Sequence, residues 1–193
     1  MDVAMNAPHP QAQASPGPVL AKTFAQAAVF WSLFLGVFPW LIHRAEPAFG
    51  LDRLRLDSFV LSMAGVLLFA AASALGIASA VFMSLYGRGT PLPLDPAVRL
   101  VVAGPYAYVR NPMAVAGLAQ GLGVAMWLGS PGTVIYVVCG MLMWDFVVRP
   151  WEEADLVRRF GGAYEQYRAN VRCWIPRRSA YRVSSAPTHT APL

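Results

Sequence analysis

The sequence predicts an all-α integral membrane protein with about four transmembrane helices, the last two forming a hairpin, and a C-terminal amphipathic helical segment. Hydrophobic residues make up 56% of the 193 residues and charged residues 13%, whereas soluble domains contain about 25% charged residues. The mean hydropathy is +0.47. The charged residues are too few for the surface of a water-soluble domain of this size. Long uncharged runs are typical of helices in a bilayer.

Three uncharged runs supply the predicted membrane-spanning helices. The first has 19 residues, close to the ~20 that cross ~30 Å of hydrocarbon as a helix. The second is long enough for a tilted helix. The third contains Gly-Ser-Pro-Gly at 129–132, a turn sequence that divides it in two. The four predicted helices are 24–42, 58–86, 113–129 and 132–148.

These helices form one predicted membrane domain, 23–178, between two tails. The tail 1–22 is rich in Ala, Pro and Gln, and the tail 179–193 has few apolar residues. Segments of this composition bury too little apolar surface to fold. We therefore expect both tails to be disordered.

The basic residues predict the orientation of the chain. If the N-terminus is cytoplasmic, 12 of the 15 basic residues lie on that side, and the far side keeps Arg44, Arg53 and Arg55. This bias follows the positive-inside rule, so topology accounts for the charge and no nucleic-acid partner is expected. Both termini and both polar segments, 88–112 and 149–178, then face the cytoplasm. The richness in Ala, Arg and Pro favours a bacterial inner membrane.

A G-x-x-x-G pattern lies on the third predicted helix, at Gly117 and Gly121. Small residues at this spacing let two helices approach closely in lipid. The pattern predicts either packing within the bundle or a homo-oligomer formed through this face.

The first polar segment ends in four residues that suit a polar ligand: Tyr106, Tyr108, Arg110 and Asn111. They precede a helix whose first backbone amides are unpaired and carry partial positive charge, which favours an anion such as a carboxylate. The alternative is interfacial anchoring, with the tyrosines at headgroup level and Arg110 as a positive-inside residue.

The second polar segment begins with charged residues on the fourth helix. Asp145 and Arg149 have i, i+4 spacing, so they either pair structurally or contact a substrate. Glu152 and Glu153 are either solvated acids of a first helical turn or acceptors for hydroxyl or cationic groups. After them, apolar residues recur every three or four positions and predict an amphipathic element on the membrane surface, broken near Gly161. They are Leu156, Phe160, Tyr164, Tyr167 and Val171.

Several other kinds of site lack their sequence patterns. No Cys/His cluster has the spacing of a metal site, so no metal is expected. The sequence also lacks a P-loop and the G-x-G-x-x-G pattern of dinucleotide-binding folds.

Taken together, the polar motifs resemble the isoprenylcysteine carboxyl methyltransferase family and its bacterial and phospholipid-methylating relatives. The resemblance covers roughly residues 85–178. The matching stretches are Gly89–Pro96, Gly104–Met113, Glu152–Glu153, Phe160–Tyr164, Tyr167, Val171 and Trp174–Pro176.

The resemblance implies S-adenosylmethionine (SAM) bound at the cytoplasmic face and a lipophilic or small acceptor, a carboxylate, thiol or amine, that arrives through the bilayer. The residues it places at the cofactor are Tyr106, Tyr108, Arg110, Asn111, Glu152 and Glu153. Ala114 and Arg149 are placed at the acceptor. Two positions depart from the family pattern, because relatives often carry His at Asn111 and Tyr at Ala114.

Two other functions remain open. A membrane reductase of the sterol-reductase type would use a nicotinamide cofactor in a similar pocket, but it would need basic residues for the dinucleotide phosphate, and the glutamate pair argues against it. A non-catalytic membrane subunit is the other alternative, favoured by Ala114.

Overall fold

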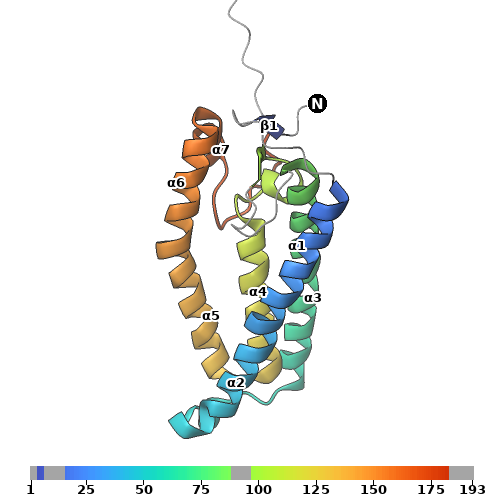
Figure 1. The fold of residues 1–193 in the computed structure, drawn as a ribbon. Helices are drawn as coiled ribbons and strands as arrows, with labels where there is room; N and C mark the ends of the chain where they lie inside the picture. Colours follow the sequence, from blue (N-terminus) through green and yellow to red (C-terminus); the bar gives the residue numbers. More distant parts are fainter. Residues whose placement is uncertain (1–3, 7–15, 88–96, 183–193) are drawn as a thin grey trace, which may run out of the picture.

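The computed structural model describes residues 4–6, 16–87 and 97–182, which form a helical bundle (Figure 1). In chain order the elements are β1 (Ala4–Asn6), α1 (Pro16–Trp31), the π-helix η1 (Ser32–Val37), α2 (Phe38–Ala45), the 3-10 helices η2 (Glu46–Phe49) and η3 (Leu51–Leu54), α3 (Phe59–Phe82), the π-helix η4 (Met83–Gly87), β2 (Arg99–Val101), the 3-10 helix η5 (Gly104–Ala107), α4 (Pro112–Leu128), α5 (Pro131–Met143), the π-helix η6 (Trp144–Val148), α6 (Arg149–Phe160) and α7 (Gly162–Asn170).

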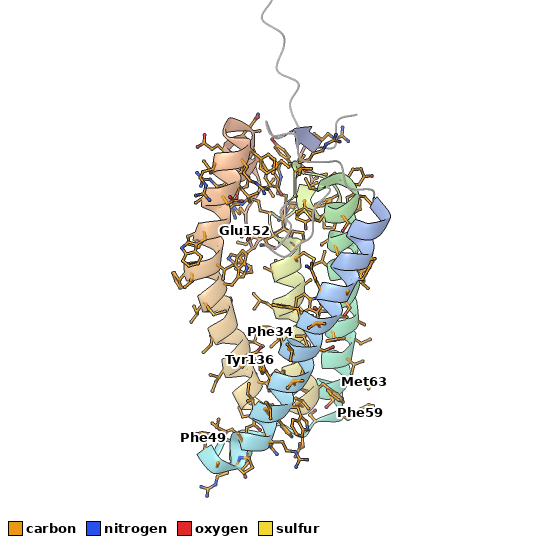
Figure 2. The ribbon with its side chains drawn as sticks, in the orientation of Figure 1. Phe34, Phe49, Phe59, Met63, Tyr136 and Glu152 are labelled. Atoms are coloured by element: carbon orange, nitrogen blue, oxygen red, sulfur yellow. The ribbon has the colours of Figure 1, made fainter. Side chains whose placement is uncertain are left out.

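Three helical columns in the described part of the chain are long and apolar enough to cross a membrane. They are Phe24–Phe49, Phe59–Gly87 and Pro131–Phe160. The apolar helix α4 is shorter, with 17 residues. The predicted class, an all-α integral membrane protein, is confirmed. Large apolar side chains such as Phe49, Phe59 and Met63 point outward from the bundle, as lipid-facing residues do (Figure 2).

The first and last columns each pass a proline without ending. A π-helical stretch ends two residues before Pro39 and another two residues before Pro150. A proline has no N–H for the carbonyl four residues earlier, and a wider turn accommodates this local break. The last column therefore continues beyond 148, the predicted end of the fourth membrane helix. It ends at Gly161, whose φ of 52° is unfavourable for other residues.

The continuation of this column corrects the expected position of the amphipathic element. We expected residues from 151 onward to lie flat on the membrane surface. Instead, α6 extends the axis of α5, and the chain turns only at Gly161 into α7 (Figure 1). The predicted break near Gly161 is confirmed.

Helices α3 and α4 pack with their backbones in close contact. A Cβ atom added to Gly65 would lie 2.5 Å from the Gly123 carbonyl oxygen, so neither helix accommodates a side chain at this crossing. Nearby, the Gln120 amide donates to the Ser73 hydroxyl at 2.8 Å, which joins the helices at a polar point. Small residues and interhelical hydrogen bonds are the usual means of helix association in lipid.

The glycines of the G-x-x-x-G pattern contact other helices of the same chain. A Cβ at Gly117 would meet the Trp31 ring at 2.6 Å, and one at Gly121 would meet Val137 at 2.9 Å. The pattern is thus used for packing within the bundle. Association of two chains through this face remains a prediction.

A buried carboxylate joins the helices at the end of the bundle opposite α7. Glu46 is 1% exposed. Its Oε2 lies 2.6 Å from Arg55 Nε, and its Oε1 accepts hydrogen bonds from the Ser130 hydroxyl and the Gly132 amide. Ser130 caps α5, and Gly129 at φ 57° ends α4. The predicted turn at 129–132 is therefore confirmed, and Glu46 fixes its position.

Both predicted tails contain ordered residues. Helix α1 begins at Pro16, inside the expected tail 1–22, because proline loses no hydrogen bond in the first turn of a helix. Strand β1 pairs antiparallel with β2, whose backbone groups supply its hydrogen bonds. In the other tail, Tyr181 is buried and its amide donates to the Ala107 carbonyl at 2.8 Å. The rest of both tails, and segment 88–96 of the first polar region, lie outside the described residues.

Candidate functional site

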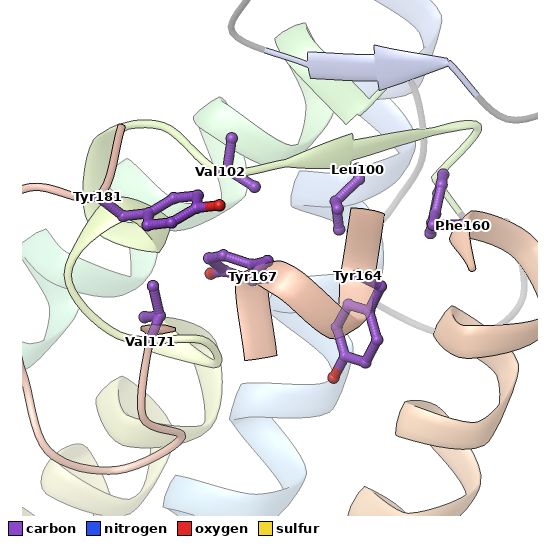
Figure 3. Close-up of a cluster of buried hydrophobic side chains, with 7 residues drawn as sticks. All are labelled: Leu100, Val102, Phe160, Tyr164, Tyr167, Val171 and Tyr181. Carbon is purple, nitrogen blue, oxygen red and sulfur yellow. The ribbon is translucent and has the colours of Figure 1, made fainter. Parts of the chain in front are cut away.

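The predicted apolar stripe contributes to a buried cluster at the polar end of the bundle. Phe160, Tyr164, Tyr167 and Val171 pack into one buried cluster (Figure 3), and Leu156 packs against it. The cluster is completed by Leu100, Val102 and Tyr181. It holds α6 and α7 against the segment that follows β2, so the two polar segments of the sequence meet here.

A segment that we call the strap, residues 171–182, attaches to the loop ahead of α4 by backbone hydrogen bonds. The Arg110 amide donates to the Arg172 carbonyl at 3.0 Å, and the Arg177 amide donates to the Tyr108 carbonyl at 2.9 Å. From α7, the Tyr167 hydroxyl donates to the Tyr106 carbonyl at 2.6 Å. The backbone of the loop is therefore fixed before any ligand is considered.

Arg110 is at the centre of the charged groups in this region. Its Nη2 lies 3.2 Å from Glu153 Oε1, and the two side chains are 11% and 20% exposed. Its Nη1 donates to the Tyr164 hydroxyl at 3.4 Å. The Nε atom is buried and has no partner among the residues that the structure describes. Arg168 adds a second cation, 3.7 Å from Glu153 Oε2.

Asn111 connects the start of α4 to the other glutamate. Its side-chain oxygen accepts from the Ala114 amide at 2.9 Å, an N-cap interaction. Its side-chain nitrogen donates to Glu152 Oε2 at 3.3 Å. The carboxylate of Glu152 therefore lies beside the first turn of α4, on which Ala114 is located.

The end of α4 has fewer free amides than the sequence indicated. Pro112 has no N–H, the Ala114 amide is capped, and the Val115 amide donates to the Asn111 carbonyl at 3.2 Å. This leaves the Met113 amide as the one unpaired donor of the first turn among the described residues. The expected anion site of several helix amides is thus reduced to a single amide next to Arg110.

Asp145 and Arg149 form the structural pair that was one of the two expectations for them. Arg149 Nε lies 3.1 Å from Asp145 Oδ1. The same oxygen accepts a hydrogen bond from the Trp174 indole at 2.8 Å. Asp145, which lies in η6, therefore also holds the strap through Trp174.

Cys173 shows that the charged groups share one environment. Its thiol is buried, and burial raises its pKa to about 11. Arg110 and Arg149 oppose this increase, while Glu153 and Glu152 add to it. Four predicted site residues thus act electrostatically on one thiol of the strap.

The two tyrosines of the loop, Tyr106 and Tyr108, differ in their exposure to solvent. Tyr106 is buried, and burial, with a smaller effect of the Glu152 charge, raises the pKa of its hydroxyl. Tyr108 is exposed. The hydroxyl of a third tyrosine, Tyr164, points away from the apolar cluster (Figure 3) and accepts a hydrogen bond from Arg110 Nη1. Burial raises the pKa of Tyr164 to about 12, so it remains protonated at neutral pH.

A cavity of about 760 Å³ lies between α1, η1, α3 and α4. Its lining is almost entirely apolar, and Met113 and Gln120 belong to it. Met113 directly follows Pro112, so the cavity reaches the first turn of α4. Among residues 4–6, 16–87 and 97–182, no group of three or more His, Cys, Asp or Glu side chains is arranged to hold a metal.

The sequence profile of the phospholipid methyltransferase family matches residues 59–163, more than half of the chain. The chain belongs to this family. The match runs from the start of α3 into α7, so it contains the Arg110–Glu153 and Asn111–Glu152 contacts. A family of methyltransferases indicates that the chain is an enzyme.

A curated relative supports the same class. Over 79 residues the chain is 42% identical to protein-S-isoprenylcysteine O-methyltransferase of Schizosaccharomyces pombe. The aligned stretch is 40% of this chain but 33% of the relative, so the chain spans about a third of the length of the relative it matches. No solved structure matches the chain significantly.

The structure brings to the charged cluster four residues to which the sequence assigned no role there. Tyr164 was predicted as part of an apolar stripe, and its hydroxyl gave no sign of a polar role. Arg168, Cys173 and Trp174 reach the site because α7 turns back and the strap crosses the loop. That return path depends on the turn at Gly161, and no spacing rule in the sequence specifies its direction.

Proposed function

We propose that the protein is a SAM-dependent methyltransferase that acts at the cytoplasmic membrane face on a lipophilic or small acceptor bearing a carboxylate, thiol or amine. The observation that carries this proposal is the convergence of Arg110, Asn111, Glu152 and Glu153 at the start of α4. A membrane methyltransferase needs a polar site for its donor next to the bilayer, and these residues supply it.

The donor set fits the groups of SAM. A carboxylate suits Arg110, whose buried Nε has no partner in the described structure. The protonated Tyr164 hydroxyl lies beside the Arg110 guanidinium, and the Met113 amide is a further donor in the first turn of α4. Glu152 is exposed and, within the described ranges, accepts one hydrogen bond, from Asn111, so it suits an ammonium or a ribose diol. When bound, SAM supplies an electrophilic methyl group on a sulfonium.

The residues of the chain then contribute alignment and exclusion of water. In-line displacement requires the reacting atoms at about 3–3.5 Å, which a fixed site provides. The strap and loop are held by the backbone bonds described above, so the site is largely preorganised. A carboxylate acceptor needs no base, which agrees with a site built from Arg, Glu and Tyr. Ala114 and Arg149 remain the proposed acceptor contacts.

An acceptor with an apolar part is supported by the surroundings of the site. The apolar cavity beside α4 reaches Met113 at the same helix end. Its volume lies within the range of about 300–1,000 Å³ that is common for small-molecule pockets. We further propose, from the distribution of basic residues, a bacterial inner membrane location with both termini cytoplasmic.

A methyl-transfer assay tests the proposal. The protein in lipid nanodiscs is incubated with SAM labelled in its methyl group and with dodecanoate, dodecanethiol or dodecylamine. Transfer of label to one of these acceptors, lost in Glu153→Gln and kept in the surface variant Glu165→Gln, supports it. Absence of transfer to all three and to a total bacterial lipid extract contradicts it.

A further inference from the structure

Trp174 connects the strap to the last membrane helix through one carboxylate. Its indole nitrogen donates to Asp145 Oδ1 at 2.8 Å, and its ring meets Trp144 edge-to-face with centroids 4.9 Å apart. The ring contact alone attaches the strap to the helix. The hydrogen bond does something additional, because it fixes the direction of the Asp145 carboxylate.

Asp145 in turn binds the Arg149 guanidinium through its Nε atom. Arg149 Nε lies 3.1 Å from Asp145 Oδ1 and 3.4 Å from the Asp145 carbonyl oxygen. Neither terminal nitrogen of Arg149 has a hydrogen-bond partner within the described ranges. A planar guanidinium held at Nε presents its two terminal nitrogens as an open fork, the geometry that binds a carboxylate or phosphate with two hydrogen bonds.

The charge of Asp145 needs an explanation beyond attachment. An isolated carboxylate is costly inside an apolar helix, and its neighbour Phe146 is 71% exposed on the outer surface of the bundle. A neutral amide would also accept the Trp174 hydrogen bond, although more weakly. The carboxylate has a second effect, because its charge also holds Arg149.

The open fork lies beside the proposed donor site. Arg149 precedes Glu152 by about one helical turn on α6, on the side toward the membrane-spanning part of the column. Its charge acts on the Cys173 thiol together with the charges of Arg110, Glu153 and Glu152. An amphiphile with its apolar part in the bilayer would therefore present its polar end to Arg149 next to the donor.

We propose that Trp174 and Asp145 are positioning residues that orient the Arg149 guanidinium to bind an anionic group of the acceptor. This inference rests on the proposed methyltransferase function and specifies it further. It gives the acceptor an anionic group, a carboxylate or a phosphate, that Arg149 holds next to the donor. Arg149 is the residue that contacts the acceptor, and Trp174 and Asp145 act through it.

Binding of two matched ligands tests this inference. N-acetyl-S-dodecylcysteine carries a carboxylate, and its carboxamide is neutral and nearly the same shape. Wild-type protein in nanodiscs should bind the acid at least about tenfold more tightly, as expected for a charge-assisted hydrogen-bonded pair. Arg149→Gln should abolish this preference. Trp174→Phe keeps the ring, Asp145→Asn keeps an acceptor for the indole, and each should reduce the preference several-fold while leaving carboxamide affinity and SAM affinity unchanged.

The control is Trp151→Phe, an exposed tryptophan of the same helix, which should keep the wild-type preference. Equal loss of both ligands in Trp174→Phe would overturn the inference, because attachment of the strap would then be its role. Absence of a preference for the acid in wild-type protein would also overturn it, whether or not the ligands bind. SAM binding, measured in the same samples, decides the proposed function separately.

Discussion

Arg110 and Glu153, which we expected to bind different groups of one ligand, bind each other: Arg110 Nη2 lies 3.2 Å from Glu153 Oε1. A ligand carboxylate at Arg110 must therefore share the guanidinium with Glu153 or use its free Nε. The pair also keeps Arg110 in place between the loop and α6. The structure thus separates an orienting role for Glu153 from the ligand-accepting role that Glu152 can take.

Replacement of Arg110 should distinguish ligand binding from membrane topology. Arg110→Ala should weaken SAM binding by roughly 10- to 150-fold, the effect of losing a hydrogen bond to a charged group of about 1.5–3 kcal/mol. Arg110→Lys keeps the charge but loses the fork, so its loss should be intermediate. Calorimetric titration measures both. Equal affinities for Lys and Arg would indicate that only the positive charge matters.

Asn111 has two separable roles. Asn111→Ala removes the cap of α4 and should destabilise the protein by about 1 kcal/mol. Asn111→Ser retains a capping oxygen but is too short to keep the 3.3 Å contact with Glu152. We expect its melting temperature to stay near the wild-type value while SAM affinity changes. A melting temperature as low as that of Asn111→Ala would contradict the assigned cap.

Glu46 should be important for stability and not for chemistry. Glu46→Gln leaves Arg55 without its charged partner, and breaking a fully buried pair costs about 3–5 kcal/mol. We expect about 2–3 kcal/mol here, because Arg55 keeps some contact with water. Thermal unfolding measures the loss. The control Asp52→Asn changes an exposed acid of the same end and should unfold like wild type; an equal effect of both would refute a specific role of Glu46.

The crossing of α3 and α4 should not tolerate a methyl group. Gly65→Ala would place its Cβ 2.5 Å from the Gly123 carbonyl oxygen, and backbone on both helices would have to move. We expect a lower melting temperature. Gly140→Ala meets no atom within 4 Å and should be neutral or slightly stabilising, since alanine favours helix. A Gly65→Ala protein as stable as Gly140→Ala would disagree with the close packing.

The sequence predicted well those features of the fold that depend on residues close together in the chain. The apolar stripe from Leu156 to Val171 packs into or against one buried cluster, as its helical periodicity indicated, although it is shared between α6 and α7. The turn at 129–132 follows from the conformational preferences of Gly and Pro. The helix that contains the predicted fourth span continues past 148, because a π-helical stretch lets the chain pass Pro150.

Contacts between distant elements were not predictable in the same way. The glycine pattern indicated Gly117 and Gly121, yet the close backbone contact of α3 with α4 is made by Gly65 and Gly123, single glycines on two helices. The sequence assigned no structural role to Glu46, because nothing in it shows that Ser130 and Gly132 lie beside this carboxylate. The candidate site shows the same limit. Its two segments were predicted to face one compartment, but the side-chain partners of Arg110 come from α6 and α7, and their approach depends on the turn at Gly161.

The most direct test of the account is a comparison of SAM and NADPH binding to the purified, folded protein by calorimetry. We predict one SAM molecule bound per chain, with affinity reduced in Arg110→Ala, and no measurable binding of NADPH. Binding of NADPH in place of SAM would favour the membrane reductase instead. Absence of SAM binding by protein with a wild-type melting curve would contradict the assignment of Arg110, Glu152 and Glu153 to a methyl-donor site.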